Sequence, residues 1–527
     1  MLNKIFTPLI LLFILIIGLF LRLYKIDSIP PHLSNDEISI AYDAFSINKT
    51  QKDEYGIHLP LSFKSQGSYK APGYAYLLSP LFNFLPNTDL TARLPSIIMG
   101  LITLLSIGLI SFYLSGSKII GLTSAALLAI TPWHIFTSRS VFEANIALAF
   151  YSLGLLFFII NFYQKKYNLF YFFISAIFFI ASIYSYHSQW LYVPLTIIFL
   201  LFLLNKQNKI KFFYLSLCII LITPLIFDSI KNQNTTARQN TQLVWQESMV
   251  AQEIDSTNSV FKKIKIVNRA ITNNYLSQIK PSFLFFEGLG LFKKNFPLEM
   301  GLFLYPFIIP FMLGLINPPQ NINKKSQKII YFLLITSPFI PAITHGSNIL
   351  RNLIFIIPSI IIISFGFVKI LKSNFFIKIS FLGFLLMSIF YFYTMYFYQS
   401  PREIADTYQG YKPIVHYLQN IEYQHAHIHY RFGPECRFIG VPHYYFGFYN
   451  YIDPKFFHNR ISDSNGTHYE KFSIQHIDWN NIDIKQNHLY ITPASNKITG
   501  KVKDKVKLEK EFFDPNGYLS FQIWKGI

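Results

Sequence analysis

Long apolar runs recur along the whole chain and are separated by short polar connections. The first, IFTPLILLFILIIGLFL, is followed by Arg22 and Lys25 instead of a small-residue cleavage site, so we interpret it as an uncleaved anchor and first spanning helix. Further runs lie near residues 92–114, 119–136, 143–162, 169–185, 190–204, 212–228, 301–316, 329–344, 352–370 and 379–397. Because a spanning helix needs about 20 mostly apolar residues, this pattern predicts a polytopic α-helical membrane protein with about 11 transmembrane helices.

The polar connections differ in charge, and this difference predicts the topology. Alternate connections contain lysines and no carboxylates: SGSK, YQKKYN, NKQNKIK, NPPQNINKKSQK and KILKSNFFIK. Lysine-rich loops stay in the cytoplasm, so the N-terminus is expected to be cytoplasmic. The apolar stretch 72–85 would reverse the side of every later lysine loop if it spanned the bilayer. We therefore expect it to lie in the membrane interface.

Three long segments then fall on the external side: 22–91, 229–300 and 398–527. In the last of them, YKPIVHYLQN predicts a helix, and HAHIHY and HLYITP predict strands. KVKLEKEFFDPNGYLSFQIW predicts a hairpin that turns at Asn516 and Gly517. We expect a transmembrane domain over residues 1–397 and a small extracytoplasmic α/β domain over residues 398–527.

The composition agrees with a membrane protein. Of 527 residues, 52% are hydrophobic and 14% are charged, whereas soluble proteins carry about 25% charged residues. The net charge of +19 comes largely from lysines between the apolar runs, which indicates cytoplasmic membrane loops rather than nucleic-acid binding. The two cysteines, Cys218 in an apolar run and Cys436 in the external domain, do not predict a disulfide.

On this topology, the charges outside the lysine loops collect on the external side. In PPHLSNDEISIAYDAF, Ser34 or Asn35 is placed to cap a helix that has Asp36 and Glu37 in its first turn. Such carboxylates can simply complement the helix dipole. Two adjacent carboxylates contribute nothing to lipid anchoring, however, so they are also candidates for proton transfer.

Candidate cations follow on the same side. Lys70, in SQGSYKAPGYAYL, can snorkel to lipid headgroups or bind a phosphate. Arg139 and Glu143, in TPWHIFTSRSVFEAN, are four residues apart and can form a structural ion pair. His345 and Arg351, in THGSNILRNLIFIIP, precede a late span, and the planar fork of an arginine suits a phosphate.

Together, carboxylates that accept a proton and cations that hold a phosphate share one face of the membrane. This combination suits a displacement in which a hydroxyl attacks an anomeric carbon and a lipid phosphate leaves. A lipid-phosphate donor contains no nucleotide. In agreement, the sequence contains neither a Walker motif nor GxGxxG.

Five segments resemble, in order, the motifs of a known group of enzymes. SNDEISIAYDAFSI, SYKAPGYAYLLSP, LTARLPSIIMG, TPWHIFTSRSVFEAN and THGSNILRNLIFIIP are similar to motifs of the polytopic GT-C glycosyltransferases of the protein O-mannosyltransferase and aminoarabinose-transferase type. The resemblance implies inverting transfer of a monosaccharide from a polyprenyl-phosphate donor. The acceptor would be a hydroxyl of a lipid, glycan or protein, on the extracytoplasmic face of a bacterial inner membrane.

The resemblance also implies roles for particular residues: Asp36 as the acidic catalytic residue, with Glu37 as its support or as an alternative base; Lys70, Arg351 and His345 at the donor phosphate; and Glu143 with its neighbour Arg139 at a second acidic and basic site.

Other interpretations remain open on the sequence. A transferase or polymerase acting on a lipid-linked oligosaccharide would need a diphosphate site, with a second basic cluster near Arg351. A secondary transporter would place its charges near the bilayer midplane, in two similar halves. Some relatives carry a divalent metal. The histidines of HAHIHY can bind one or can lie on a solvent-facing strand edge; no other cofactor is expected.

Overall fold

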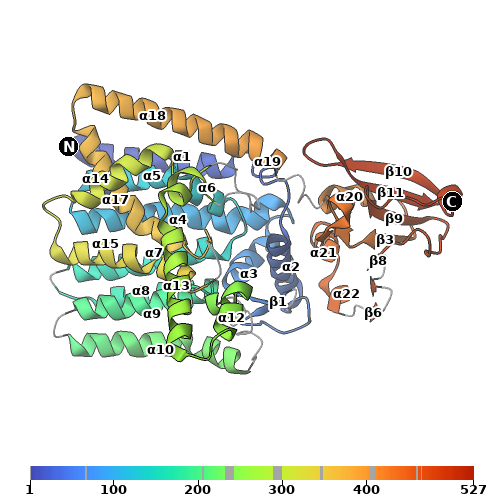
Figure 1. Ribbon diagram of the computed structural model, residues 1–527, viewed down its shortest axis with the longest axis horizontal. Coiled ribbons are helices and arrows are strands. Elements are labelled where there is room, and N and C mark those ends of the chain that lie inside the picture. The colour runs from blue at the N-terminus through green and yellow to red at the C-terminus, as the bar shows by residue number, and fades with distance from the viewer. Residues whose placement is uncertain are drawn as a thin grey trace.

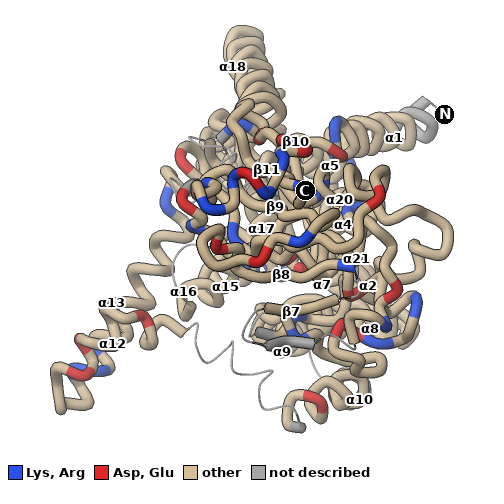
Figure 2. Tube along the Cα trace, turned by 90° about the vertical axis from the view of Figure 1, so that its right-hand side faces the viewer, with Lys and Arg blue, Asp and Glu red and all other residues tan. Residues whose placement is uncertain are grey.

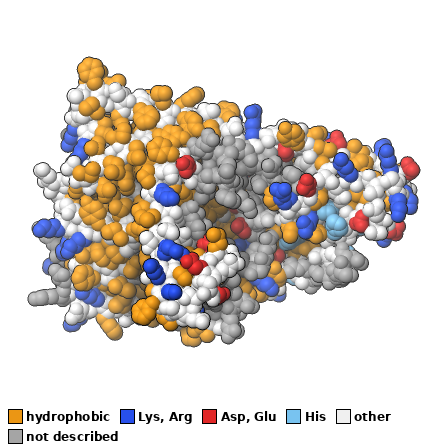
Figure 3. All heavy atoms as spheres, viewed as in Figure 1, with side chains coloured by type: hydrophobic (Ala, Val, Ile, Leu, Met, Phe, Trp, Pro, Cys, Tyr) orange, Lys and Arg blue, Asp and Glu red, His pale blue; other side chains and the backbone are white. Residues whose placement is uncertain are grey.

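The computed structural model of the chain describes residues 2–65, 68–164, 166–204, 207–231, 243–288, 300–344, 348–403, 410–458, 461–463, 466–469 and 471–527. Its N-terminal part is a bundle whose helices run side by side, and its C-terminal part is a mixed sheet beyond one end of that bundle (Figure 1). Apolar side chains cover the flank of the bundle that Figure 3 shows, whereas charged side chains are frequent over the C-terminal domain. This distribution agrees with a bundle that is immersed in lipid.

Every predicted apolar run coincides with a helix or with a broken pair of helices. The bundle contains α1 (Leu2–Leu23), α4 (Asp89–Ser115), α5 (Lys118–Ala129), α6 (Pro132–Ser138), α7 (Glu143–Phe162), α8 (Leu169–Ser185), α9 (Gln189–Leu203), α10 (Asn208–Lys231), α14 (Ile308–Ile316), α15 (Lys324–Thr336), α16 (Phe339–Ala342), α17 (Ile356–Leu371) and α18 (Phe375–Thr394). The prediction of a polytopic helical membrane protein is therefore confirmed.

The predicted number of spans is larger than length and composition alone support. In the described part of the chain, five helices are long and apolar enough to cross a membrane, or six if α5 and α6, bent by 63°, form one span. Four more apolar helices are shorter. The breaks occur at Pro132, which begins α6, and at Pro338, between α15 and α16. Proline lacks an N–H and disfavours helix at the residue before it, so an uninterrupted apolar run becomes two helices.

Close helix packing in the bundle depends on glycine where two backbones meet. A Cβ at Gly366 of α17 would collide with the carbonyl oxygen of Pro310 in α14, and a Cβ at Gly314 of α14 would collide with that of Ile362 in α17. Membrane helices gain most of their association energy from such close contact, because lipid supplies no hydrophobic driving force between them.

The first long loop forms a layer at one end of the bundle. It contains α2 (Asn35–Thr50), an antiparallel pair of strands β1 (Phe63–Ser65) and β2 (Ser68–Lys70), α3 (Gly73–Leu78) and the 3-10 helix η1 (Ser79–Asn83). The stretch 72–85 thus forms short helices and no span, as predicted. Lys118 begins α5, directly after the 27-residue helix α4, which starts beside this layer; Lys118 therefore lies at the opposite end of the bundle.

The C-terminal domain has the elements that the sequence predicts, arranged around a seven-stranded sheet. Its helices include α20 (Tyr411–Leu418), α21 (Pro442–Tyr449) and α22 (Pro454–His458), and the strands of the sheet are β3 (His425–His429), β6 (Ile461–Asp463), β7 (Gly466–His468), β8 (Phe472–Gln475), β9 (His488–Pro493), β10 (Val506–Phe513) and β11 (Leu519–Gly526). The short strands β4 (Arg431–Phe432) and β5 (Phe438–Ile439) form a separate antiparallel pair. The strand order is β10-β11-β9-β3-β8-β7-β6. The HAHIHY strand is therefore central, because β3 pairs in parallel with both β8 and β9. The strand-edge alternative for its histidines is wrong.

Helix α21, with the sequence PHYYFGFY, packs the C-terminal domain against α2. Tyr42 of α2 and Tyr444 of α21 belong to one hydrophobic core that extends over both regions. A Cβ at Gly447 would lie 2.5 Å from the ring of Tyr42, so the glycine in this aromatic helix permits the close approach. The α2 layer is consequently held between the bundle and the C-terminal domain.

In the part that the structure describes, the second long loop includes the α-helices α12 (Ser248–Asp255) and α13 (Val260–Ile279). They follow the short 3-10 helix η3 (Val244–Gln246) and form an arm that projects from the side of the bundle (Figure 2). In Figure 1, α13 runs across the direction of the bundle helices.

Candidate active site

The acidic pair at the start of α2 consists of one buried and one exposed carboxylate. Glu37 is fully buried, and its two oxygens accept hydrogen bonds from the backbone N–H groups of Ser34, at 2.9 Å, and Val141, at 2.8 Å. The Ser34 hydroxyl accepts from the N–H of Glu37, which completes a capping box. Asp36 is exposed. Glu37 thus fastens the segment after α6 to α2, and Asp36 stays accessible to a reactant.

Lys70 ends strand β2 and points at the same helix. Its ammonium group donates to Oδ2 of Asp43, at 2.7 Å, and to the hydroxyl of Ser39, at 3.0 Å, and the residue is 4% exposed. The Ser39 hydroxyl donates to the carbonyl oxygen of Asp36 at 2.9 Å. Positions 36, 39 and 43 share one side of a helix. Lys70 is therefore buried against the side of α2 that begins with Asp36, and it does not extend towards lipid headgroups.

The partner of Lys70 is a poorly solvated carboxylate. Asp43 is 1% exposed, and burial raises its pKa to about 6 although the nearby Lys70 acts in the opposite direction. Our sequence reasoning assigned Asp43 no role. The signal was present, because Asp43 follows Asp36 by seven residues, two turns along the same side of the helix.

A pocket lies beside Lys70, between the first loop and the ends of three bundle helices. The first loop contributes Ser62, Lys70 and Pro72 to its walls. The connection of α8 to α9 contributes His187, and the start of α9 contributes Trp190. The His187 ring nitrogen Nε2 lies 3.1 Å from the carbonyl oxygen of Tyr69, next to Lys70. The sequence analysis missed His187 and Trp190. Their clustering at a predicted external turn, in IYSYHSQWLY, was the available signal.

Arg351 lies in the segment before α17 and is close to the same end of α9. The Tyr192 hydroxyl donates to the carbonyl oxygen of Arg351 at 3.0 Å, and Tyr192 is two residues beyond Trp190 of the pocket. Indole Nε1 of Trp133 donates to the carbonyl oxygen of Ile349 at 3.1 Å, which fixes this segment on α6. The structure thus brings the Arg351 backbone to the end of the bundle where Lys70 lies. His345 lies outside the described residues.

The side chain of Arg139 forms its hydrogen bonds with backbone groups. Its guanidinium donates to the carbonyl oxygens of Leu21, at 2.9 Å, Arg22, at 3.0 Å, and Ile29, at 2.8 Å. It therefore fastens the end of α1 and the following turn to α6. Glu143 is the first residue of α7, two residues after the N–H that binds Glu37.

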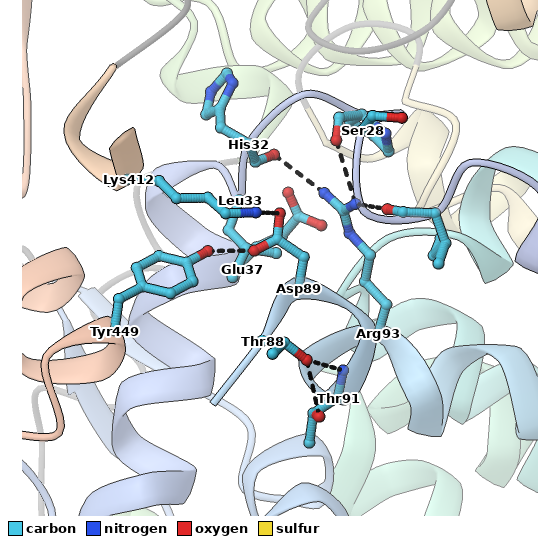
Figure 4. A network of polar contacts seen from close by, with 12 residues as sticks. Ser28, His32, Leu33, Glu37, Thr88, Asp89, Thr91, Arg93, Lys412 and Tyr449 are labelled. Atoms are coloured by element: carbon cyan, nitrogen blue, oxygen red, sulfur yellow. Dashed lines mark hydrogen bonds and ion pairs between the residues drawn. The ribbon is translucent and has the colours of Figure 1, made fainter. Parts of the chain in front are cut away.

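A further polar network joins the first loop, α4 and the C-terminal domain (Figure 4). Asp89, fully buried at the start of α4, accepts a hydrogen bond from the Tyr449 hydroxyl and pairs with the Lys412 ammonium at 3.0 Å. Arg93, one turn further, donates to the carbonyl oxygens of Ile26, Pro30 and His32. The sequence analysis assigned no role to this network, because Lys412 and Tyr449 lie more than 300 residues from Asp89.

The described residues do not fit a bound metal. No group of three or more His, Cys, Asp or Glu side chains in them is placed to hold an ion. The histidines of β3 contact one another and β9 instead: Nε2 of His427 lies 3.1 Å from Nδ1 of His488. Burial, followed by the neighbouring imidazoles, lowers the pKa of His427 to about 3. We therefore assign no step to a metal.

Comparison with known families gives one match. Residues 69–227 match the family described as dolichyl-phosphate-mannose-protein mannosyltransferase. This range includes Lys70, Arg139 and Glu143, together with the pocket residues His187 and Trp190. A comparison with curated proteins found no match.

Solved structures share the fold over more of the chain. ArnT from Cupriavidus metallidurans, bound to undecaprenyl phosphate, aligns with 99% of this chain and 97% of its own at a TM-score of 0.57 and 10% identity. An oligosaccharyltransferase from Archaeoglobus fulgidus, tethered to an acceptor peptide, aligns with 99% of this chain and 74% of its own at a TM-score of 0.53 and 11% identity.

A third structure is the archaeal oligosaccharyltransferase AglB from Archaeoglobus fulgidus, in complex with an inhibitory peptide and a dolichol-phosphate. It aligns at a TM-score of 0.50 and 13% identity, over 80% of this chain and 58% of its own. The present chain thus spans little more than half the length of that relative, and identities this low show a common fold alone. In agreement with the resemblance predicted from the motifs, residues 69–227 match the dolichyl-phosphate-mannose-protein mannosyltransferase family, within an integral, multi-pass membrane protein that has the fold of ArnT.

Proposed function

We propose that the chain is an inverting glycosyltransferase that moves a monosaccharide from a polyprenyl phosphate to a hydroxyl-bearing lipid, glycan or protein. The main support is the placement of Lys70, a buried cation at the wall of a pocket and on the Asp36 side of α2. The family match, and the undecaprenyl phosphate bound to ArnT, agree with a lipid-phosphate donor.

In the proposed reaction, the acceptor hydroxyl oxygen attacks the anomeric carbon of the donor sugar. The Asp36 carboxylate takes the hydroxyl proton as the new carbon–oxygen bond forms. The bond between the anomeric carbon and the phosphate oxygen breaks, its electron pair stays on that oxygen, and polyprenyl phosphate leaves. A single displacement of this kind inverts the anomeric configuration.

Lys70 and Arg351 stabilise the negative charge that develops on the leaving phosphate. Without the donor, Asp43 neutralises Lys70. The donor phosphate is a diester with one negative charge, and it gains a second as the bond to the anomeric carbon breaks, so the leaving phosphate competes with Asp43 for the ammonium group. Glu37 acts by holding α2 against the segment that begins α7, so its role is positioning. Glu143, the first residue of α7 and next to that segment, is the candidate for the second acidic site. His345, which precedes Arg351 in the sequence and lies outside the described residues, would assist Arg351 at the donor phosphate.

Substitution of Asp36 tests the proposal. Mass spectrometry of glycans and glycolipids from cells with and without the chain identifies the transferred unit. Cells with Asp36→Asn should lack this product, since an amide cannot accept the proton, and we expect a rate lower by about 10²–10⁴-fold. Asp27→Asn is the matched control, because Asp27 is an exposed aspartate of the same loop.

Normal product in cells with Asp36→Asn would exclude Asp36 as the base. A transferred oligosaccharide would instead favour the alternative of oligosaccharide transfer, in line with the fold shared with the archaeal enzymes.

We also propose that the N-terminus is cytoplasmic, that residues 398–527 form an extracytoplasmic domain, and that the membrane is a bacterial inner membrane. Basic side chains at the end of the bundle away from the C-terminal domain (Figure 3) support this orientation. A cysteine at the exposed position of Asn480 should react with an impermeant maleimide in intact spheroplasts. Reaction only after permeabilisation would mean that the topology is inverted.

A further inference from the structure

The arm formed by α12 and α13 presents large apolar side chains that nothing in the described chain covers. At the start of α13, Val260 is 67% exposed, Phe261 86% and Ile264 52%. An isolated exposed apolar residue needs no explanation, but three within two turns of one helix form a surface.

The residues of α13 are divided between two sides. Val260, Ile264, Val267 and Ile271 recur at intervals of four and three residues, which places them on one side of a helix, with Phe261 at its margin. The opposite side carries Lys262, Lys265 and Arg269. An amphipathic helix with lysine and arginine on its polar side has the composition of a helix that lies in a membrane interface.

The contacts of α13 fix its position relative to the bundle. The Tyr275 hydroxyl donates to the carbonyl oxygen of Ile335 at 3.0 Å. Ile335 is a 61% exposed apolar residue near the end of α15, opposite the lysines that begin this helix. The Asn274 amide donates to the carbonyl oxygen of Thr344, at 3.0 Å, just beyond α16. The second half of α13 is therefore attached at the end of the bundle where the first loop lies.

The direction of the α13 axis shows where the first half of this helix lies. Because the helix crosses the direction of the bundle helices (Figure 1) and projects sideways from the bundle (Figure 2), its first half extends beyond the bundle in the plane of the membrane. The material at that depth, next to lipid-facing residues such as Ile335, is the outer leaflet.

We infer that α13 is a membrane-inserted arm. Val260, Phe261 and Ile264 lie among the acyl chains at the boundary of the extracytoplasmic leaflet, and Lys262, Lys265 and Arg269 face the phosphates of the lipid headgroups. Arg269 also pairs with Glu253 of α12, so α12 is carried along on the polar side.

The arm is joined at both ends to the segment that bears Arg351. At its beginning, the N–H of Val244 donates to the carbonyl oxygen of Ile343 at 3.0 Å. At its end, the Asn352 amide donates to the carbonyl oxygen of Gln278 at 3.4 Å. When the arm is inserted in the leaflet, these two hydrogen bonds fix the depth of the Arg351 segment relative to the lipid surface. This second step rests on the proposed function, in which Arg351 binds a phosphate attached to a membrane lipid.

Site-directed spin labelling tests the insertion without any activity assay. A label is placed at Phe261→Cys, or at Asn273→Cys on the polar side as the matched control, in full-length protein with Cys218→Ala and Cys436→Ser. The protein is reconstituted in nanodiscs that contain anionic phospholipid. The label at position 261 should be accessible to oxygen and protected from a water-soluble nickel complex, and the label at position 273 should show the reverse.

Access of the nickel complex to position 261 would overturn the inference. Protection of position 261 from both reagents would also overturn it, since that result indicates cover by a protein or by a second copy of this chain.

A kinetic comparison tests the link to the Arg351 segment. In proteoliposomes, the double substitution Phe261→Glu and Ile264→Glu should raise the KM for the polyprenyl-phosphate sugar by about tenfold, because expelling the arm displaces the segment. Asn273→Glu, which adds a carboxylate on the polar side of the helix, is the control and should leave KM unchanged. An unchanged KM in the double variant would refute the link but not the insertion. A lack of transfer by the unsubstituted chain would refute the proposed function and leave the labelling result intact.

Discussion

Two sets of buried cations lie at the same end of the bundle, and their partners differ. The guanidinium groups of Arg93 and Arg139 donate to backbone carbonyl oxygens at the end of α1 and in the segment that follows it. The ammonium group of Lys70 donates to a carboxylate and a hydroxyl. The arginines complete the hydrogen bonding of a fixed piece of chain, whereas Lys70 has an ionic partner that a ligand can replace.

The difference separates residues that maintain the fold from residues that can bind substrate. A buried carbonyl oxygen has no other donor available if the arginine is removed, so its loss acts on stability. The pair of Lys70 and Asp43 is held in an environment that disfavours the charged carboxyl, as the raised pKa of Asp43 indicates. The four predictions below separate these two kinds of site, from the largest expected effect to the smallest.

Arg93→Ala should have the largest effect, on stability. It leaves three carbonyl oxygens without their donor, each worth about 1–3 kcal/mol. We expect lower yield and a lower thermal unfolding temperature in detergent, with an unchanged donor KM for the protein that does fold. Arg437→Ala, at an exposed position, is the control. Normal stability together with a changed KM would move Arg93 into the substrate-binding group.

Lys70→Ala should weaken donor binding and leave stability nearly unchanged, which is the reverse of the result expected for Arg93→Ala. A charged hydrogen bond contributes about 1.5–3 kcal/mol, so losing the phosphate contact should raise the donor KM by about 10–100-fold. The unfolding temperature should change little, because Asp43 becomes neutral when its partner is removed. Lys64→Ala, at an exposed position of β1, should show normal kinetics. An unchanged KM in Lys70→Ala would assign Lys70 a structural role like that of the arginines.

The Asp43 carboxyl should make the α2 layer more stable in mild acid. Its native pKa, about 6, lies above the unfolded value of 3.8. The native state therefore holds more protons between these pH values, and the contribution of Asp43 to stability falls as the pH rises through this window. The full effect is at most about 3 kcal/mol. Thermal unfolding from pH 4 to 7 should show a smaller loss on raising the pH in Asp43→Asn; parallel curves would contradict the shift.

His427 should give an effect of opposite sign in the C-terminal domain, and it ranks last because solvent reaches part of its half-buried ring and screens the charge. Its native pKa, about 3, lies below the ordinary value of 6.5. The unfolded state then binds more protons, so the contribution of His427 to stability is present above pH 6.5 and declines as the pH falls towards 3. His427→Gln should lose less stability than the unsubstituted chain between pH 6.5 and 4. An equal loss in both proteins would argue against the shifted pKa.

The elements were largely predictable because their signals are local. Each apolar run became a helix or a broken pair, and the strands HAHIHY and HLYITP and the hairpin at Asn516 and Gly517 lie where the pattern indicated. The capping of α2 by Ser34 also followed from adjacent residues. The number of uninterrupted spans was less predictable, because a proline such as Pro132 breaks a helix without lowering the hydropathy of the run.

The site was predictable only in part, since the roles of charged residues depend on partners distant in the sequence. The sequence placed Asp36, Lys70 and Arg351 at one end of the bundle, but it did not pair Lys70 with Asp43. The sequence suggested that Glu37 and Arg139 take part in the reaction. In the structure, Glu37 accepts a hydrogen bond from the N–H of Val141, and Arg139 donates one to the carbonyl oxygen of Ile29.

By itself, the sequence determined which segments enter the membrane, which end of the bundle collects polar residues, and the elements of the C-terminal domain, because hydrophobic period, capping and turn residues act over a few positions. Only the tertiary structure decided which of the gathered charges are bound by backbone and which are paired with an exchangeable partner. The physical reason is that a bend in the chain leaves particular N–H and C=O groups without hydrogen bonds, and a charged side chain is fixed where it meets them.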